Sequence, residues 1–211
     1  MVAAVLVLGL VAEAGAWWTV STRDRSVWTT IIPVAGAMGF AALVLGPPAL
    51  SGEASVVAAA GLGAGAGVVL YLGTRAFVRV VRGWTRFRRD AARVYGRRGR
   101  VPLALATALS AGVSAAGEEL FWRGLFRTHV AGGSQAPVAS ALVTWAAFVL
   151  ANLPSANLAV VAGAVVGGAV WTGLALWTEG VLASLLCHGV WTALMVSAPV
   201  VRQPPRGSGS P

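Results

Sequence analysis

The chain has 211 residues, of which 57% are hydrophobic and 11% are charged, whereas a soluble globular domain carries about 25% charged residues. So few polar side chains cannot cover the surface of a soluble fold of this size, which excludes that class. All sixteen basic residues behind the net charge of +9 are arginines, and ten of them lie between Arg75 and Arg100. This concentration is typical of a cytoplasmic loop under the positive-inside rule, and it argues against nucleic acid as a partner.

Apolar stretches of about 20 residues, the length that a helix needs to cross a bilayer, recur along the chain. They show no two-residue alternation, so we expect helices. The sequence therefore predicts an all-α fold, a polytopic transmembrane bundle of about seven spans that forms one membrane domain over residues 1–211. The predicted spans are Val2–Val20, Val27–Leu45, Ala54–Thr74, Val101–Leu125, Ala136–Leu153, Leu158–Trp177 and Gly180–Val201.

Residues 75–100, between the third and fourth spans, are predicted to form a basic cytoplasmic interfacial loop. Its apolar residues recur at helical spacing among the arginines, which predicts an amphipathic helix on an anionic leaflet with its aromatic stripe among the lipid headgroups. The stripe consists of Phe77, Val80, Val81, Trp84, Phe87, Ala91, Val94 and Tyr95. This orientation places fourteen of the sixteen arginines inside and the N-terminus on the far side.

The composition indicates where the protein is found. An Arg-only chain rich in alanine, glycine and valine is typical of a GC-rich bacterial genome, so we expect a multi-pass protein of a bacterial inner membrane. Residues 203–211 are predicted to form a disordered tail.

Glycines mark predicted helix contacts. Gly61, Gly63, Gly65 and Gly67 form two interleaved GxxxG pairs, and residues 163 and 167 form a third. Small residues let helix backbones approach closely in lipid, so we interpret all three pairs as packing positions.

Ionisable groups are costly inside a membrane, so each one within a span calls for a partner or a function. The candidates are Glu13, Glu118, Glu119, Arg123 and His188. Glu119 and Arg123 are four residues apart on one helix face and can form an ion pair. Glu118 projects about 100° away, without such an obligatory partner on its own helix. It suits a general base; alternatively, all three charges form one buried cluster that joins helices.

Two further polar positions lie in later spans. His188 shares a helix face with Ser184 and Thr192, each four residues away. A neutral imidazole at this position can donate a hydrogen bond to a developing oxyanion or orient a water molecule; alternatively, it bonds to a neighbouring helix. Asn152, near the end of the fifth span, can meet the glutamates or cap its helix before Pro154.

Taken together, these segments resemble the CAAX protease and bacteriocin-processing (CPBP, or ABI) family of intramembrane glutamic endopeptidases. The family motifs are Glu-Glu-x-x-x-Arg, Phe-x-x-x-His and His-x-x-x-Asn (or Asp) on successive helices. The sequence EELFWRG at 118–124 matches the first motif, whereas FVLAN at 148–152 has Asn in place of His and HGVWT at 188–192 has Thr in place of Asn. The resemblance covers about residues 104–201, the expected CPBP-like catalytic core.

The resemblance implies an endopeptidase that cleaves a membrane-associated protein or peptide with glutamate-activated water. In this reading Glu118 is the base, and Glu119 and Arg123 are its supporting pair. His188 is the oxyanion donor, and Thr192 is a weaker hydroxyl substitute for the family's Asn.

The departures from the motifs leave a second function open. Asn152, at the position of the family's second-motif His, can hold a water molecule but cannot accept its proton. The alternative is therefore an inactive membrane scaffold or immunity protein that binds a peptide. We expect no cofactor and no metal, because one intramembrane His with carboxylates falls short of the three ligands of a catalytic zinc, and Cys187 is the single cysteine.

The side from which a substrate reaches the site is open at this stage. In a straight helix from Val101, Glu118 lies about 25 Å along the axis towards the far side, whereas the eukaryotic prenyl-protein relatives are reached from the cytosol.

Overall fold

The computed structural model describes residues 1–96 and 101–201, and within these ranges the chain is helical without a strand. The predicted all-α fold is therefore confirmed. The predicted tail at 203–211 and residues 97–100 of the basic loop lie outside the described residues, as do the side chains of Val94 and Tyr95.

The helical elements follow one another in a simple order. They are α1 (Val2–Thr22), α2 (Ile31–Leu45), α3 (Val56–Val80), α4 (Thr85–Gly96), α5 (Leu103–Thr107), η1 (Ala108–Ala115), α6 (Ala116–Glu119), η2 (Leu120–Phe126), α7 (Arg127–His129), η3 (Gly133–Gln135), α8 (Pro137–Asn152), η4 (Leu153–Ser155), α9 (Leu158–Ala162), η5 (Gly163–Gly167), α10 (Gly168–Trp177) and α11 (Leu182–Ser197). Elements α5 to α7 form one continuous helical stretch, as do α9 to α10, with π-helical turns at η1, η2 and η5.

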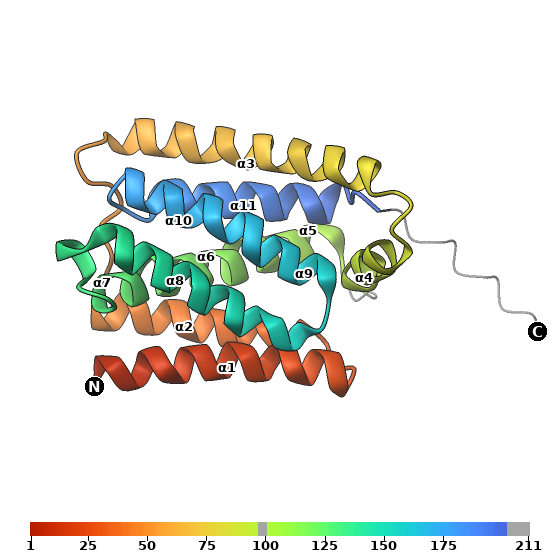
Figure 1. Cartoon of the computed structure of the whole chain (residues 1–211), viewed down its shortest axis with the longest axis horizontal. Helices are drawn as coiled ribbons and strands as arrows, with labels where there is room; N and C mark the ends of the chain where they lie inside the picture. Colours follow the sequence, from red (N-terminus) through yellow and green to blue (C-terminus); the bar gives the residue numbers. More distant parts are fainter. Residues whose placement is uncertain (97–100, 202–211) are drawn as a thin grey trace, which may run out of the picture.

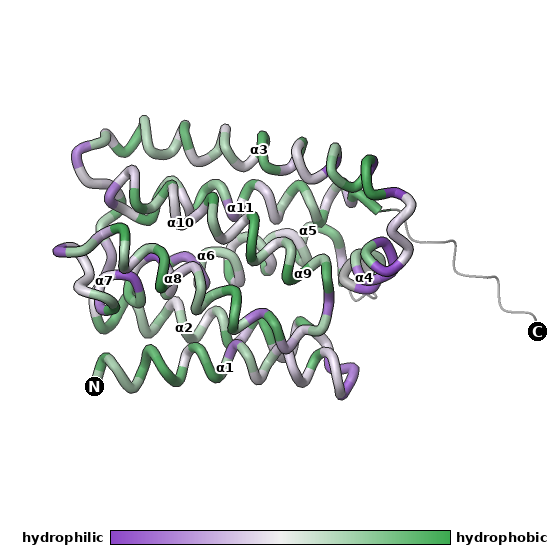
Figure 2. Tube along the Cα trace, viewed as in Figure 1, coloured by the Kyte–Doolittle hydropathy of each residue, from purple (hydrophilic) through white to green (hydrophobic). Residues whose placement is uncertain are grey.

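The long helices lie side by side, with α1 and α2 at one edge of the bundle and α3 beside α11 at the other (Figure 1). The loop at 23–30, helix α4 and residues 198–201 meet at one end, which we call the basic end. Hydrophilic residues gather in α4 and in the connections at the two ends, while hydrophobic residues follow the helices (Figure 2). This distribution matches a bundle that crosses a bilayer with its arginine-rich end on one side.

Four helices in the described ranges are long and apolar enough to cross a membrane: Val2–Thr22, Val56–Val80, Pro137–Ser155 and Leu158–Trp177. Helices α2 and α11 are apolar but have 15 and 16 residues, so each is shorter than the roughly 30 Å hydrocarbon core of a typical bilayer. The stretch from α5 to α7 coincides with the predicted fourth span and carries Glu118, Glu119 and Arg123. Seven helical stretches thus match the predicted positions, while seven membrane crossings remain a prediction.

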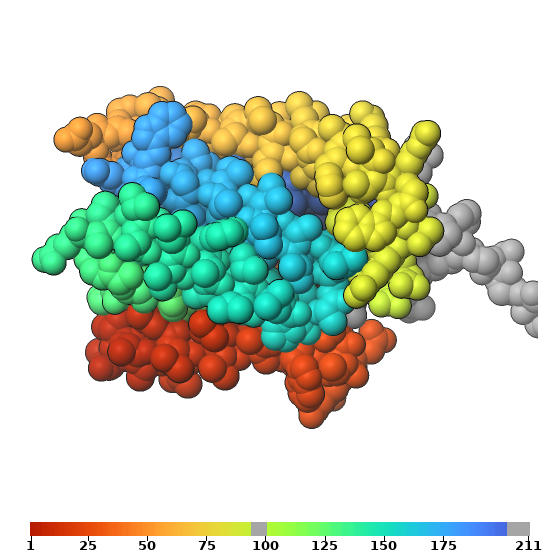
Figure 3. Space-filling model, viewed as in Figure 1, coloured from red at the N-terminus to blue at the C-terminus, as the bar shows by residue number. Residues whose placement is uncertain are grey.

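Helix α4 lies within the predicted loop at 75–100, but part of its apolar stripe faces the protein. Phe87 and Ala91 are buried against the bundle, and Asp90 accepts a hydrogen bond from the backbone N of Leu158 at 3.1 Å. Figure 3 shows α4 packed beside the first turns of α9. The stripe is therefore divided between the protein and its surroundings, and binding of the helix to anionic lipid remains a prediction.

Glycines bring the amino-terminal helices against the stretch that carries the first motif. A Cβ atom on Gly39 would lie 2.6 Å from Cα of Gly117, so α2 and α6 touch at their backbones. On α1, Gly9 leaves the space that the ring of Phe121 occupies. These contacts place α1 and α2 directly beside the two glutamates of α6.

The glycines of α3 behave as two different pairs. A Cβ on Gly63 would lie 2.8 Å from Cα of Ala183, and one on Gly67 would lie 2.7 Å from the carbonyl oxygen of Cys187, so this pair packs on α11. Gly61 and the residue four positions later have open space around them. Only one of the two interleaved pairs therefore makes the predicted contact with a helix of the bundle.

This difference supplies a matched test of the fold. Gly63→Val should destabilise the protein by about 1–3 kcal/mol, because the added side chain must push α3 away from α11. Gly61→Val changes the same helix by the same side chain on its open face and should leave stability nearly unchanged. Thermal unfolding of both variants in detergent measures the difference, and equal melting temperatures would contradict the α3–α11 contact.

Candidate active site

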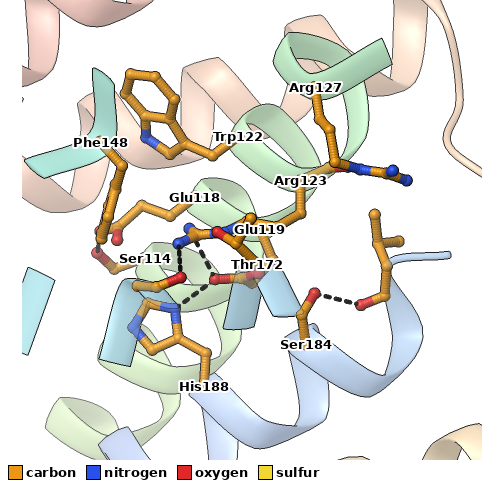
Figure 4. A network of polar contacts seen from close by, with 12 residues as sticks. Ser114, Glu118, Glu119, Trp122, Arg123, Arg127, Phe148, Thr172, Ser184 and His188 are labelled. Atoms are coloured by element: carbon orange, nitrogen blue, oxygen red, sulfur yellow. Dashed lines mark hydrogen bonds and ion pairs between the residues drawn. The ribbon is translucent and has the colours of Figure 1, made fainter. Parts of the chain in front are cut away.

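A buried network joins the two motif residues Glu119 and Arg123 to the last helix (Figure 4). Arg123 Nη1 donates to Glu119 Oε1 at 3.2 Å, and both side chains are inaccessible to solvent. His188 Nδ1 lies 2.9 Å from the same oxygen. The ion pair predicted from the four-residue spacing is present, and the histidine of α11 shares its carboxylate.

Arg123 also holds the stretch α9–α10 in place. Its Nε donates to Thr172 Oγ1 and its Nη2 to the carbonyl oxygen of Gly168, each at 3.2 Å. The guanidinium carbon lies 4.4 Å from the ring centroid of Phe148, a distance at which a cation–π interaction stabilises a desolvated charge. Each nitrogen of the guanidinium has an acceptor on α6 or α10, and the ring of Phe148 on α8 lies against its carbon, so three separate elements orient the planar side chain.

The ring of His188 is fixed on both sides. It stacks on Trp171 with ring centroids 3.5 Å apart and an interplanar angle of 14°, while Nδ1 points to Glu119. A carboxylate that is ionised can only accept, so Nδ1 carries a proton in this arrangement. The other ring nitrogen, Nε2, is left for the cavity that His188 lines.

Glu118 leaves the helix in a different direction from its neighbour (Figure 4). Its Oε1 accepts a hydrogen bond from Ser114 Oγ at 3.2 Å. This hydroxyl, one turn earlier on the same helix, is a partner that spacing analysis did not name, but it is not a cation like the one that pairs with Glu119. A hydroxyl leaves the carboxylate unneutralised, and Glu118 lines the same cavity as His188.

The cavity has a volume of about 1280 Å³ and occupies the half of the bundle nearest the basic end. One stripe of the α5–α6 stretch lines it from the basic end to the site: Leu103, Ala106, Ser110, Ser114 and Glu118. The cavity wall therefore runs from the basic end to a carboxylate far along this helix.

Asn152 meets a glutamate, but neither of the two in the first motif. Its Nδ2 donates to Glu13 Oε1 at 2.9 Å and to the carbonyl oxygen of Phe148 at 2.9 Å. The second carboxylate oxygen, Glu13 Oε2, accepts from Trp122 Nε1 at 2.7 Å. Glu13 is thus a site residue that motif analysis does not assign, and its one sequence signal is a lone charge in an apolar span.

The structure brings most of the predicted site residues to one place. Glu118, Asn152, His188 and Thr192 all line the cavity, and Glu119 and Arg123 are buried behind it. Ser184, which shares the face of His188, donates to the carbonyl oxygen of Val181, and Cys187 is buried. In residues 1–96 and 101–201, no three side chains of the metal-ligating types converge on one point.

Apolar helices around a buried glutamate–arginine–histidine network define this chain as a multi-pass helical membrane protein with a deep cavity. Residues 99–194 match the family model described as type II CAAX prenyl endopeptidase Rce1-like. This segment holds all three motifs, so the family match confirms the resemblance seen in them. No curated protein and no solved structure gave a significant match.

The network makes a prediction about stability. Arg123→Gln should cost about 3–5 kcal/mol, because it leaves the carboxylate of Glu119 buried without its cation. Arg127→Gln, one turn later, removes a half-buried guanidinium that donates to the backbone of residue 123, and should cost less than about 1 kcal/mol. Unfolding of the purified variants in denaturant measures both, and a mild effect of Arg123→Gln would contradict the central role of the pair.

Proposed function

We propose that this protein is an intramembrane endopeptidase of a bacterial inner membrane, in which Glu118 activates the water that hydrolyses a peptide bond. The observation that carries the proposal is the division of the two motif glutamates. Glu119 is engaged by Arg123 and His188, whereas Glu118 has one hydroxyl partner and lines the cavity. The family match supports protease activity, and this geometry supports Glu118 as the base.

The chemistry follows from where each group lies. Glu118 takes a proton from water as the oxygen attacks the carbonyl carbon of the scissile bond, and the carbonyl oxygen becomes an oxyanion. Glu118 then gives that proton to the leaving nitrogen as the C–N bond breaks. These steps yield a carboxylic acid and an amine, and they require a base within reach of the cavity, which Glu118 provides.

Oxyanion stabilisation is assigned to His188 and Thr192. Because Nδ1 of His188 is committed to Glu119, Nε2 donates a hydrogen bond only when the ring is an imidazolium; a neutral ring would offer Nε2 as an acceptor. We therefore assign the imidazolium, paired with Glu119, as the oxyanion donor, in place of the neutral imidazole considered from the sequence. Thr192 supplies a hydroxyl from the next turn of α11.

The first test removes the base without changing the shape of the site. Glu118→Gln keeps an oxygen that can accept from Ser114, and it should lower cleavage by about 10²–10⁴-fold, the usual contribution of a positioned general base. Glu53→Gln makes the same exchange at an exposed position and should cleave like the wild type. The assay compares the protein termini in membranes of bacteria that express each form, followed by cleavage of the identified substrate by purified protein in lipid vesicles.

This experiment separates the protease from the inactive scaffold. New termini that appear with the wild type and with Glu53→Gln, but not with Glu118→Gln, support the enzyme. Identical termini in cells with and without the protein would overturn the proposal in favour of a peptide-binding scaffold. Cleavage that persists in Glu118→Gln would overturn the assignment of the base.

The second test concerns the route of the substrate. Ser110 lies on the cavity wall between the basic end and Glu118, so Ser110→Trp should obstruct the path and lower kcat/KM at least about tenfold in a folded protein. Ala108→Trp places the same side chain on the exposed face of the same stretch and serves as the control. Full activity in Ser110→Trp would show that substrates reach Glu118 by another way.

A further inference from the structure

Helix α1 contributes a carboxylate to the site from outside the segment that matches the family. Glu13 is 3% exposed, and both of its carboxylate oxygens accept hydrogen bonds from residues of the motif-bearing helices, Trp122 and Asn152. We infer that Glu13 is a positioning residue that holds the amide of Asn152 for water activation in the reaction; this inference rests on the proposed protease function.

The contacts of Asn152 determine which of its atoms faces the cavity. Its Nδ2 donates to Glu13 and to the carbonyl oxygen of Phe148. An ionised carboxylate and a backbone carbonyl are both acceptors only, so the amide nitrogen must face them and both of its hydrogens are used. The cavity, which Asn152 lines, is left with the acceptor Oδ1.

An acceptor at this place completes the site around Glu118. A water molecule in the cavity has two O–H groups: one gives its proton to Glu118, and the other can donate to Oδ1 of Asn152. The amide thereby orients the water without taking a proton, which Glu118 does alone.

Only a carboxylate satisfies both neighbours of Glu13. Trp122 Nε1 and Asn152 Nδ2 are both donors, and glutamine has one acceptor oxygen and one donor nitrogen. In Glu13→Gln one of the two contacts therefore becomes donor against donor, although the size of the side chain is kept. A buried donor without an acceptor is costly, so the amide of Asn152 loses its fixed orientation.

The same geometry indicates how Glu13 would hold the family's histidine if it stood at position 152. A histidine there would donate one ring N–H to Glu13 and present its other nitrogen to the cavity as an acceptor that can take a proton. Glu13 would then orient the imidazole and stabilise its charged form. The effect of Glu13 should therefore be larger with His at 152 than with Asn.

The experiment is a double-mutant cycle on cleavage in lipid vesicles with wild type, Glu13→Gln, Asn152→His and the double variant. Asn152→His should raise kcat at least about tenfold, and Glu13→Gln should remove most of that gain, with a coupling of about tenfold between the two positions. KM should change little, since Glu13 is not part of the cavity wall. If Glu13 only packs α1 against the bundle, Glu13→Gln lowers kcat by the same factor in the wild type and in Asn152→His. That result would overturn the inference.

Two controls make the cycle decisive. Trp122→Phe removes the other donor to Glu13 but keeps the contact with Asn152, so it should lower kcat less than Glu13→Gln; an equal loss would indicate a packing role and overturn the inference. Glu13→Asp, which withdraws the carboxylate from Trp122 and Asn152 by the length of one methylene group, replaces Glu13→Gln if the latter does not fold. Glu118→Gln is measured alongside. If Glu118→Gln is inactive and Glu13 shows no coupling, the role of Glu13 is overturned and the proposed protease is not, whereas wild-type cleavage in Glu118→Gln overturns the assignment of Glu118 as the base.

Discussion

The ion pair between Glu119 and Arg123 is the contact on which the geometry of the site depends. Charges buried this deeply persist only when they are paired and their hydrogen-bonding groups are satisfied. Arg123 meets this demand with Glu119, Thr172 and the carbonyl oxygen of Gly168, and His188 approaches the same carboxylate from α11. The stretches α6–η2 and α10 and helix α11 can therefore pack only in the register that supplies these acceptors.

This constraint gives two neighbouring glutamates different surroundings. Successive side chains of a helix project about 100° apart, so Glu118 cannot join the pair that Glu119 forms. It meets the hydroxyl of Ser114 and the cavity instead. The helix thus gives two identical side chains different surroundings: one carboxylate orders the bundle, and the other lines the cavity.

Contacts along one helix could be predicted from spacing, and contacts between helices could not. The apolar runs locate the long helices within a few residues, although α3 continues to Val80 through residues that the hydropathy pattern assigns to a loop. Four-residue spacing predicts the pair of Glu119 with Arg123. The partner of Asn152 depends on how α8 and α1 rotate about their axes as they pack, which spacing within either helix does not encode.

The place of Glu13 follows from the cost of an isolated charge in an apolar helix. A buried carboxylate needs donors, and Trp122 and Asn152 supply them. Equally, Trp122 Nε1 and the amide hydrogen of Asn152 that does not bond to Phe148 need an acceptor, which Glu13 supplies. The carboxylate of α1 therefore satisfies two donors of the later helices, and those donors satisfy the carboxylate. An amide held by two acceptors keeps its oxygen for the cavity, so the first helix takes part in building a site whose recognisable motifs all lie in later helices.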